Sequence, residues 1–151
     1  MGSEMCIRDR LADGGSTKCD WILLDNEGEI VFKTRTEGLN PAIFDISLLE
    51  IRLKKNEELA LHREKIETVH FFGAGCGTSK PTEMLTKVFE EYFVNADVVV
   101  REDMVAAVYA ATAEPGIVCI LGTGSNSCYF CLLYTSPSPR DLSTSRMPSS
   151  A

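Results

Sequence analysis

Two segments rich in glycine and hydroxyl side chains, residues 11–21 and 120–127, adjoin apolar runs typical of β-strands. Glycine lets a backbone approach a ligand closely, and loops of this composition offer hydroxyls and backbone N–H groups that suit a phosphate. Asp13 opens the first loop, where a carboxylate can hold Mg²⁺ against phosphate oxygens. Two such loops facing one another would clamp a polyphosphate, so the pair predicts phosphoryl transfer.

Both ends of the chain lack the apolar periodicity of folded protein. Codons for residues 5–10 can be chosen whose reverse complement encodes residues 131–136, and the complementarity extends to residues 2–4 and 136–139. An inverted repeat of this kind resembles a sequencing adapter translated at both ends. We therefore expect residues 1–10 and 131–151 to be non-native, the latter disordered, and exclude both from the fold prediction. A basic disordered tail is the alternative interpretation.

The composition of the chain limits the classes of partner that it can bind. A net charge of −7 disfavours nucleic acid and anionic membrane surfaces as partners. No apolar run approaches the roughly 20 residues of a membrane-spanning helix. Four cysteines lie outside the two ends and show no Cys-x-x-Cys spacing, so they are interpreted as reduced thiols of a cytoplasmic protein: Cys19, Cys76, Cys119 and Cys128.

The order of apolar patterns predicts a mixed α/β sheet whose first strands are joined by hairpins. Period-two and buried-type runs predict strands at residues 20–25, 29–36, 68–73, 96–100 and 117–121, with another beginning at residue 127. The run 117–121 is typical of a strand at the centre of a sheet. Helical spacing predicts helices over residues 45–63, 80–93 and 104–112.

Four motifs in sequence order, residues 13–18, 38–41, 102–103 and 122–126, resemble the N-acetylglucosamine kinase family. That group overlaps the BadF/BadG/BcrA/BcrD ATPase family and has the actin-like ATPase fold of sugar kinases. The resemblance implies that residues 11–130 form a truncated, ribonuclease H-like N-terminal half with helices packed on a mixed sheet. It implies a second half, carrying the adenine pocket, that this chain lacks, so we expect the chain alone to be inactive. A homodimer is among the assemblies open to the longer parent.

The resemblance implies a nucleotide role for the two loops, with ATP and Mg²⁺ as cofactors. Asp13 would organise the Mg²⁺ ion through water. The phosphates of ATP would be held by Gly14, Gly15, Ser16, Thr17, Gly122 and Thr123. An ordinary glycine turn is the alternative for each loop.

The resemblance also implies a base and a sugar site. Asp103 would accept the proton of the attacking sugar hydroxyl. The cap of the helix that follows is a second reading of this aspartate, and the two roles are compatible. The sugar would be contacted by Asn40, Thr123, Gly124 and Asn126, whose alternative interpretation is that of turn residues.

Residues 73–78 form a further glycine-rich segment, but the Gly-x-Gly-x-x-Gly spacing of a dinucleotide fingerprint is not met. We interpret the segment as a tight strand-to-helix connection near the cleft, with Cys76 inert. His62 and His70 are interpreted as structural residues.

Three functions remain open from the sequence. The first is a kinase that converts an amino sugar, N-acetylglucosamine, to its 6-phosphate. The second is an ATPase that activates an acyl-CoA dehydratase, which requires a cysteine-held cluster that Cys19 and Cys76 are not convincingly placed to bind. The third is a non-catalytic sensor of sugar or nucleotide, and the presence of Asp103 disfavours it.

Overall fold

The fold is seen in a computed structural model that describes residues 7–121 and 125–130. The chain divides into two compact units, one ending at Asp103 and one beginning at Met104. None of the helices in the described residues is long and apolar enough to span a membrane.

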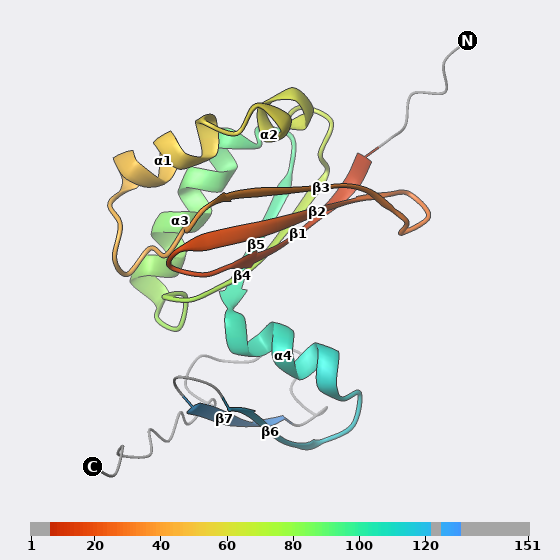
Figure 1. The fold of residues 1–151 in the computed structure, drawn as a ribbon, viewed down its shortest axis with the longest axis vertical. Helices are drawn as coiled ribbons and strands as arrows, with labels where there is room; N and C mark the ends of the chain where they lie inside the picture. Colours follow the sequence, from red (N-terminus) through yellow and green to blue (C-terminus); the bar gives the residue numbers. More distant parts are fainter. Residues whose placement is uncertain (1–6, 122–124, 131–151) are drawn as a thin grey trace. The chain divides into compact units, whose positions relative to one another are not determined.

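The first unit is built on a five-stranded mixed sheet in the order β3-β2-β1-β4-β5 (Figure 1). Strands β1, β2 and β3 are antiparallel neighbours, whereas β4 pairs parallel with β1, and β5 pairs parallel with β4. The bounds of the strands are Ile7–Gly14 for β1, Lys18–Asp25 for β2, Ile30–Glu37 for β3, Thr68–Gly73 for β4 and Asp97–Glu102 for β5. The hairpin-joined mixed sheet predicted from the sequence is confirmed.

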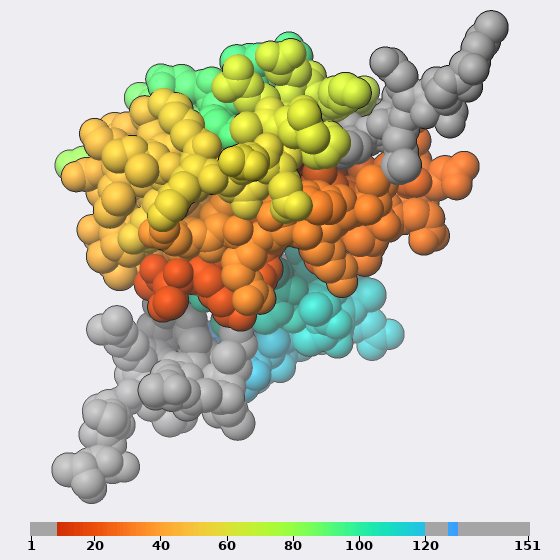
Figure 2. Space-filling model, turned by 45° about the horizontal axis from the view of Figure 1, so that its top comes forward, coloured from red at the N-terminus to blue at the C-terminus, as the bar shows by residue number. Residues whose placement is uncertain are grey.

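Three helices cover one face of this sheet: α1 (Ile46–Lys54), α2 (Glu57–His62) and α3 (Ser79–Tyr92). Strand β2 shows why that face is chosen, because alternate residues Cys19, Trp21 and Leu23 are fully buried and the residues between them are not. Figure 2 shows α1 and α2, in yellow tones, forming a continuous surface with the orange strands beside them.

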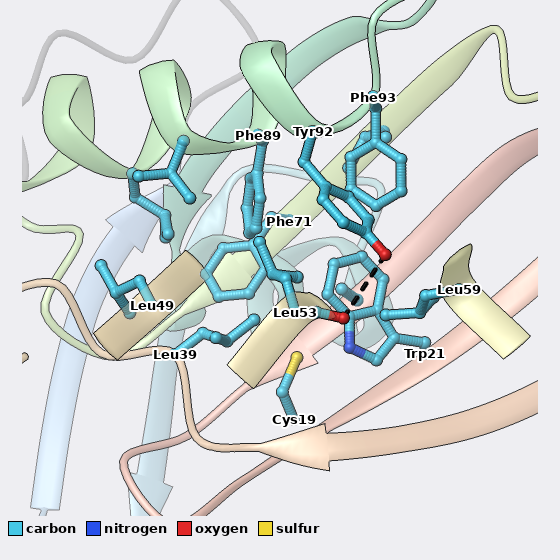
Figure 3. Close-up of a cluster of buried hydrophobic side chains, with 14 of the residues drawn as sticks. Cys19, Trp21, Leu39, Leu49, Leu53, Leu59, Phe71, Phe89, Tyr92 and Phe93 are labelled. Carbon is cyan, nitrogen blue, oxygen red and sulfur yellow. Dashed lines mark hydrogen bonds between the residues drawn. The ribbon is translucent and has the colours of Figure 1, made fainter. Parts of the chain in front are cut away.

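Aromatic rings form the centre of the core between the sheet and α3 (Figure 3). The rings of Phe71 and Phe89 lie 5.1 Å apart, and Trp21 meets Phe89 edge-on at 5.9 Å. The indole N–H of Trp21 donates to the hydroxyl of Thr36 at 3.1 Å, so its one polar atom is satisfied inside the core. This packing fixes α3 against β2 and β4. The first residues of β2 and the last residues of β4 adjoin the candidate site.

The prediction of one helix over residues 45–63 is wrong, because the segment is divided into α1 and α2. The side chain of Asn56 accepts a hydrogen bond from the backbone N–H of Leu59 and so begins a new helix. The same side chain donates to the Thr34 hydroxyl and the Arg35 carbonyl of β3. Asn56 therefore separates α1 from α2 and at the same time binds this segment to the sheet.

The second unit contains most of α4 (Asp103–Ala111) and the hairpin of β6 (Gly116–Leu121) and β7 (Ser125–Phe130). Its small core consists of Met104, Val108 and Cys128. The prediction that residues 117–121 form a central strand is wrong for the part of the chain that the structure describes, where β6 pairs only with β7.

Strand β1 begins at Ile7, so residues 7–10, assigned above to a translated adapter, form the first half of a strand. Arg10 occupies a core position of that strand, with Leu23 and Val69 as its neighbours on β2 and β4. Its side chain is fully buried, and its guanidinium nitrogens have no hydrogen-bond partner among the described residues. The domain boundaries proposed from the sequence stay a prediction.

Candidate functional site

The candidate site lies at the edge of the sheet where the parallel strands β1, β4 and β5 end. Gly14, Gly73 and Glu102 are aligned in one row across these three strands. The edge therefore gathers the β1–β2 turn, the β4–α3 loop and the start of α4. In open α/β sheets, ligands bind beyond the carboxyl ends of the strands.

The β1–β2 turn is held in place by its own backbone and by two neighbouring segments. Within the turn, the Gly15 N–H donates to the Lys18 carbonyl at 2.8 Å. From outside, the Ala74 N–H donates to the Gly14 carbonyl at 2.8 Å, and the Gly38 N–H donates to the Thr17 carbonyl at 2.9 Å. The turn is thus anchored to the β4–α3 loop on one side and to the segment that follows β3 on the other.

The middle of this turn is open to a ligand. Ser16 and Thr17 are exposed, and within the described residues their backbone N–H groups donate no hydrogen bond. Consecutive N–H groups and hydroxyls on a tight turn make a concavity that binds anions. This geometry suits the phosphate role predicted for these two residues, and the role itself stays a prediction.

The turn also depends on a close backbone approach at Gly38. A Cβ atom at this position would lie 2.1 Å from the Ser16 carbonyl oxygen, which is backbone and cannot rotate away. The guanidinium of Arg52, on α1, donates to the Gly38 carbonyl and lies over the ring of Phe44 at 3.9 Å. Helix α1 is therefore linked through one carbonyl to the segment that supports the turn.

Asp13 is exposed at the end of β1, beside the turn. Among residues 7–121 and 125–130, no group of three His, Cys, Asp or Glu side chains gathers closely enough to hold a metal ion. Mg²⁺ is commonly bound through one or two carboxylates together with water and substrate phosphates. A single carboxylate beside an anion-binding turn fits that mode, so Asp13 remains the candidate for the ion.

Two carboxyl groups lie at the β5–α4 junction. Asp103 is exposed in the first turn of α4, where the helix dipole favours a negative charge. Glu102 is half-buried beside the β4–α3 loop, since its Oε1 lies 3.1 Å from where a Cβ on Gly77 would stand. Burial, together with the neighbouring Asp103 carboxylate, raises the pKa of Glu102 above its ordinary value. Glu102 belongs to the motif at residues 102–103, and its sequence context alone indicates no role for it.

Asn40 lies against the turn from the segment that follows β3. Its Nδ2 donates to the Ser16 hydroxyl at 2.8 Å, and its Oδ1 accepts from the Ala42 N–H at 2.9 Å. The residue is only 6% exposed. The structure therefore brings a predicted sugar residue, Asn40, together with a predicted phosphate residue, Ser16.

Cys76 lies in the β4–α3 loop, and its thiol is buried. Burial, with a smaller contribution from the Asp103 and Glu102 carboxylates, raises the pKa of Cys76 to about 12. The thiolate is the reactive form of cysteine, so the thiol is expected to be inert.

Alkylation with iodoacetamide at pH 8 tests this expectation. We expect exposed Cys119 to be labelled and Cys76 to react at least about a hundredfold more slowly, because so little of its thiol ionises at that pH. Mass spectrometry of the peptides gives the two rates, and labelling in urea shows that both cysteines are reactive once unfolded. Equal rates in the folded chain would contradict the burial of Cys76.

The remaining predicted site residues follow the first unit in the chain. Gly122, Thr123 and Gly124 lie outside the described residues. Asn126 was expected in a loop, but it lies in β7, paired with Ile120 in the second unit. The facing pair of phosphate loops therefore stays a prediction.

Comparison with known proteins identifies the fold. No family model and no curated protein matches the chain. A putative N-acetylglucosamine kinase from Porphyromonas gingivalis matches 93% of this chain at 32% identity, with a TM-score of 0.72. At TM-scores of 0.56, a putative N-acetylglucosamine kinase from Chromobacterium violaceum matches 83% of the chain at 17% identity, and a ROK family glucokinase from Streptomyces griseus, in complex with glucose and AMPPNP, matches 82% at 21% identity.

The matched regions cover 47%, 45% and 44% of those three proteins, so the chain spans about half the length of the structures it resembles. All three have the actin-like ATPase fold. The chain has this fold too, and the ribonuclease H-like fold class predicted from its sequence is confirmed.

Proposed function

We propose that this chain forms part of an ATP-dependent sugar kinase whose substrate is N-acetylglucosamine and whose product is the 6-phosphate. The observation that carries the proposal is the meeting of an anion-binding turn and an acidic residue at one sheet edge. Ser16 and Thr17 present hydroxyls and N–H groups there, and Asp103 begins the helix that follows β5. Phosphoryl transfer requires both a phosphate cradle and a group that takes the proton of the attacking hydroxyl.

The reaction assigns a step to each part. The turn binds the β- and γ-phosphates of ATP through the Ser16 and Thr17 groups. The Asp103 carboxylate accepts the proton of the sugar hydroxyl as its oxygen bonds to the γ-phosphorus. The bond from that phosphorus to the bridging oxygen breaks, and ADP leaves. Asp13 would hold a Mg²⁺ ion, which would neutralise part of the phosphate charge.

The choice of sugar rests on similarity. The Porphyromonas gingivalis protein that matches nearly the whole chain is a putative N-acetylglucosamine kinase. We further propose that the partners are ATP and the sugar alone, with no nucleic acid or membrane, that the protein acts in the cytoplasm, and that the longer parent assembles as a homodimer.

An assay of ADP release tests the proposal. It uses the product of the uninterrupted gene that the adapter interpretation predicts, with the 151-residue chain in parallel. We expect release that depends on N-acetylglucosamine and exceeds release with glucose or no sugar by at least about tenfold, a difference of about 1.4 kcal/mol. The chain alone is expected to give none. ADP release that does not depend on any sugar would contradict the proposed kinase activity and favour an ATPase. Iron analysis would then be the next step.

A further inference from the structure

We infer that Arg52, on α1, is a positioning residue for the sugar. Its guanidinium holds both ends of the segment 38–45, which joins β3 to α1 and is here called the β3–α1 connection. This connection carries Asn40, the residue predicted to contact the sugar. The inference deepens the proposed function, and it rests on that function for the identity of the ligand.

The guanidinium of Arg52 makes three contacts. Its Nη1 donates to the carbonyl of Gly38, the first residue of the connection. Its carbon lies 3.9 Å from the ring centroid of Phe44, near the other end of the connection. Its Nε lies 3.4 Å from Oε2 of Glu37, the last residue of β3. A planar guanidinium can donate hydrogen bonds and stack on a ring at the same time, which an ammonium cannot do.

The two held ends of the connection act on Asn40 through the backbone. On one side, the Phe44 N–H donates to the Asn40 carbonyl at 3.0 Å. On the other side, Gly38 precedes Asn40 by two residues, and its N–H donates to the Thr17 carbonyl at 2.9 Å. Arg52 therefore fixes the chain on both sides of Asn40, and it fixes the connection against the β1–β2 turn.

The burial of Arg52 distinguishes it from the surface charges of the same helix. Only 15% of its side chain is exposed, whereas 62% of the Lys54 side chain is exposed two residues later. Pairs of exposed charges contribute little, because both side chains keep their freedom and water screens them. A mostly buried guanidinium that is bonded to a carbonyl and stacked on a ring is held in one geometry. Arg52 is therefore placed to determine where Asn40 lies.

Two variants of Arg52 and one control separate positioning from charge. Arg52→Met removes the donor and the cation, whereas Arg52→Lys keeps the cation and removes the planar group. Arginine, methionine and lysine have similar helix propensities, so α1 is preserved. Glu37 also pairs with Lys55 at 2.7 Å, so neither variant leaves this carboxylate without a cation. Lys54→Met is the matched control, because it removes from α1 a cation that pairs with Glu50.

Hydrogen exchange in the ligand-free 151-residue chain is the first measurement. We expect exchange at the Gly38 and Phe44 amides to accelerate about fivefold or more in Arg52→Met, as loss of one hydrogen bond predicts. The Ala74 amide holds the other side of the β1–β2 turn, and its exchange should stay as in the unaltered chain. Lys54→Met should change exchange at none of the three amides.

Two exchange results would overturn the inference. One is unchanged exchange at both Gly38 and Phe44 in Arg52→Met. The other is equal acceleration at Gly38, Phe44 and Ala74, which would show a general loss of stability. If Arg52→Met does not fold, Arg52→Lys decides on the same amides. We then expect exchange at Phe44 to accelerate about twofold or more, because the stacked plane is lost, and an unchanged rate would overturn the inference.

Kinetics of the whole protein is the second measurement. We expect Arg52→Met to raise KM for N-acetylglucosamine about fivefold and to leave kcat and KM for ATP within about twofold, since the turn keeps its bond from Ala74. Lys54→Met should match the unaltered protein. An unchanged KM for the sugar, or equal rises in KM for the sugar and for ATP, would overturn the inference. If the whole protein transfers no phosphate to any sugar, the proposed function fails, and the exchange result still decides whether Arg52 holds the connection.

Discussion

Asp103→Asn is expected to lower kcat for sugar phosphorylation by about 10²–10⁴-fold and to leave KM for ATP and for the sugar within about threefold. An amide cannot accept the proton of the attacking hydroxyl, so the loss falls on the chemical step. Asparagine is close to aspartate in size, so α4 loses only the interaction of the Asp103 charge with the helix dipole, about 0.3–1 kcal/mol. The substitution therefore removes the base at a small cost to the start of α4.

Asp97→Asn is the matched control for this experiment. Asp97 is an exposed aspartate at the opposite end of the same strand, β5, away from the candidate site. We expect kcat of this variant to equal that of the unaltered protein. An Asp103→Asn enzyme that keeps more than about a tenth of the original kcat would contradict the role of Asp103, because base catalysis contributes at least about a hundredfold. Equal losses in both variants would show a general effect of charge instead.

The sheet could be predicted because its signals are local. Residues 20–36 alternate around a turn and predict a hairpin, while the later strands alternate with helical segments, which predicts parallel pairing. The division between α1 and α2 also had a local signal, since Asn56 is followed by Glu57 and Glu58, a helix start. The helical spacing of apolar residues continues through residues 45–63, and it favoured one continuous helix over a new start at Asn56.

The site could be predicted only in its parts. The turn after β1 was identified from its glycines and hydroxyl side chains, and the aspartate after β5 from the family resemblance; the sheet topology brings both to one edge. The contact of Asn40 with Ser16 could not be predicted, because it joins residues on either side of the β2–β3 hairpin.

Arg10→Leu is expected to raise the free energy of unfolding of this chain by about 2–4 kcal/mol at pH 7. Arg10 occupies a core position of β1, fully buried between Leu23 and Val69, and its guanidinium has no hydrogen-bond partner within the described residues. The charge has a favourable contact with the ring of Phe93, 5.1 Å from the guanidinium carbon, and a smaller favourable interaction with Tyr92. A cation over a desolvated ring contributes about 2 kcal/mol, less than the several kcal/mol that burying an unpaired ion costs.

The pH dependence follows from the same burial, which lowers the pKa of Arg10 to about 9. The unfolded chain then holds more protons than the folded chain between about pH 9 and the ordinary arginine pKa, so stability rises with pH in that range. The cost of the buried charge is therefore complete below about pH 9 and declines above it. We expect the advantage of Arg10→Leu to be largest at pH 7 and to shrink at pH 10.

Urea denaturation at the two pH values measures this difference, with Arg35→Leu as the control. Arg35 is an exposed arginine of β3 that pairs with Asp20, so its replacement should change stability by less than about 1 kcal/mol. Two results would contradict a buried cation at this position. One is an Arg10→Leu chain that is no more stable than the unaltered chain, and the other is a difference in their free energies of unfolding that does not change with pH. The adapter interpretation makes Arg10 a non-native residue at a core position of a strand. It therefore predicts that an apolar side chain at residue 10 stabilises the fold. The uninterrupted gene should therefore encode an apolar residue there, which its sequence can establish directly.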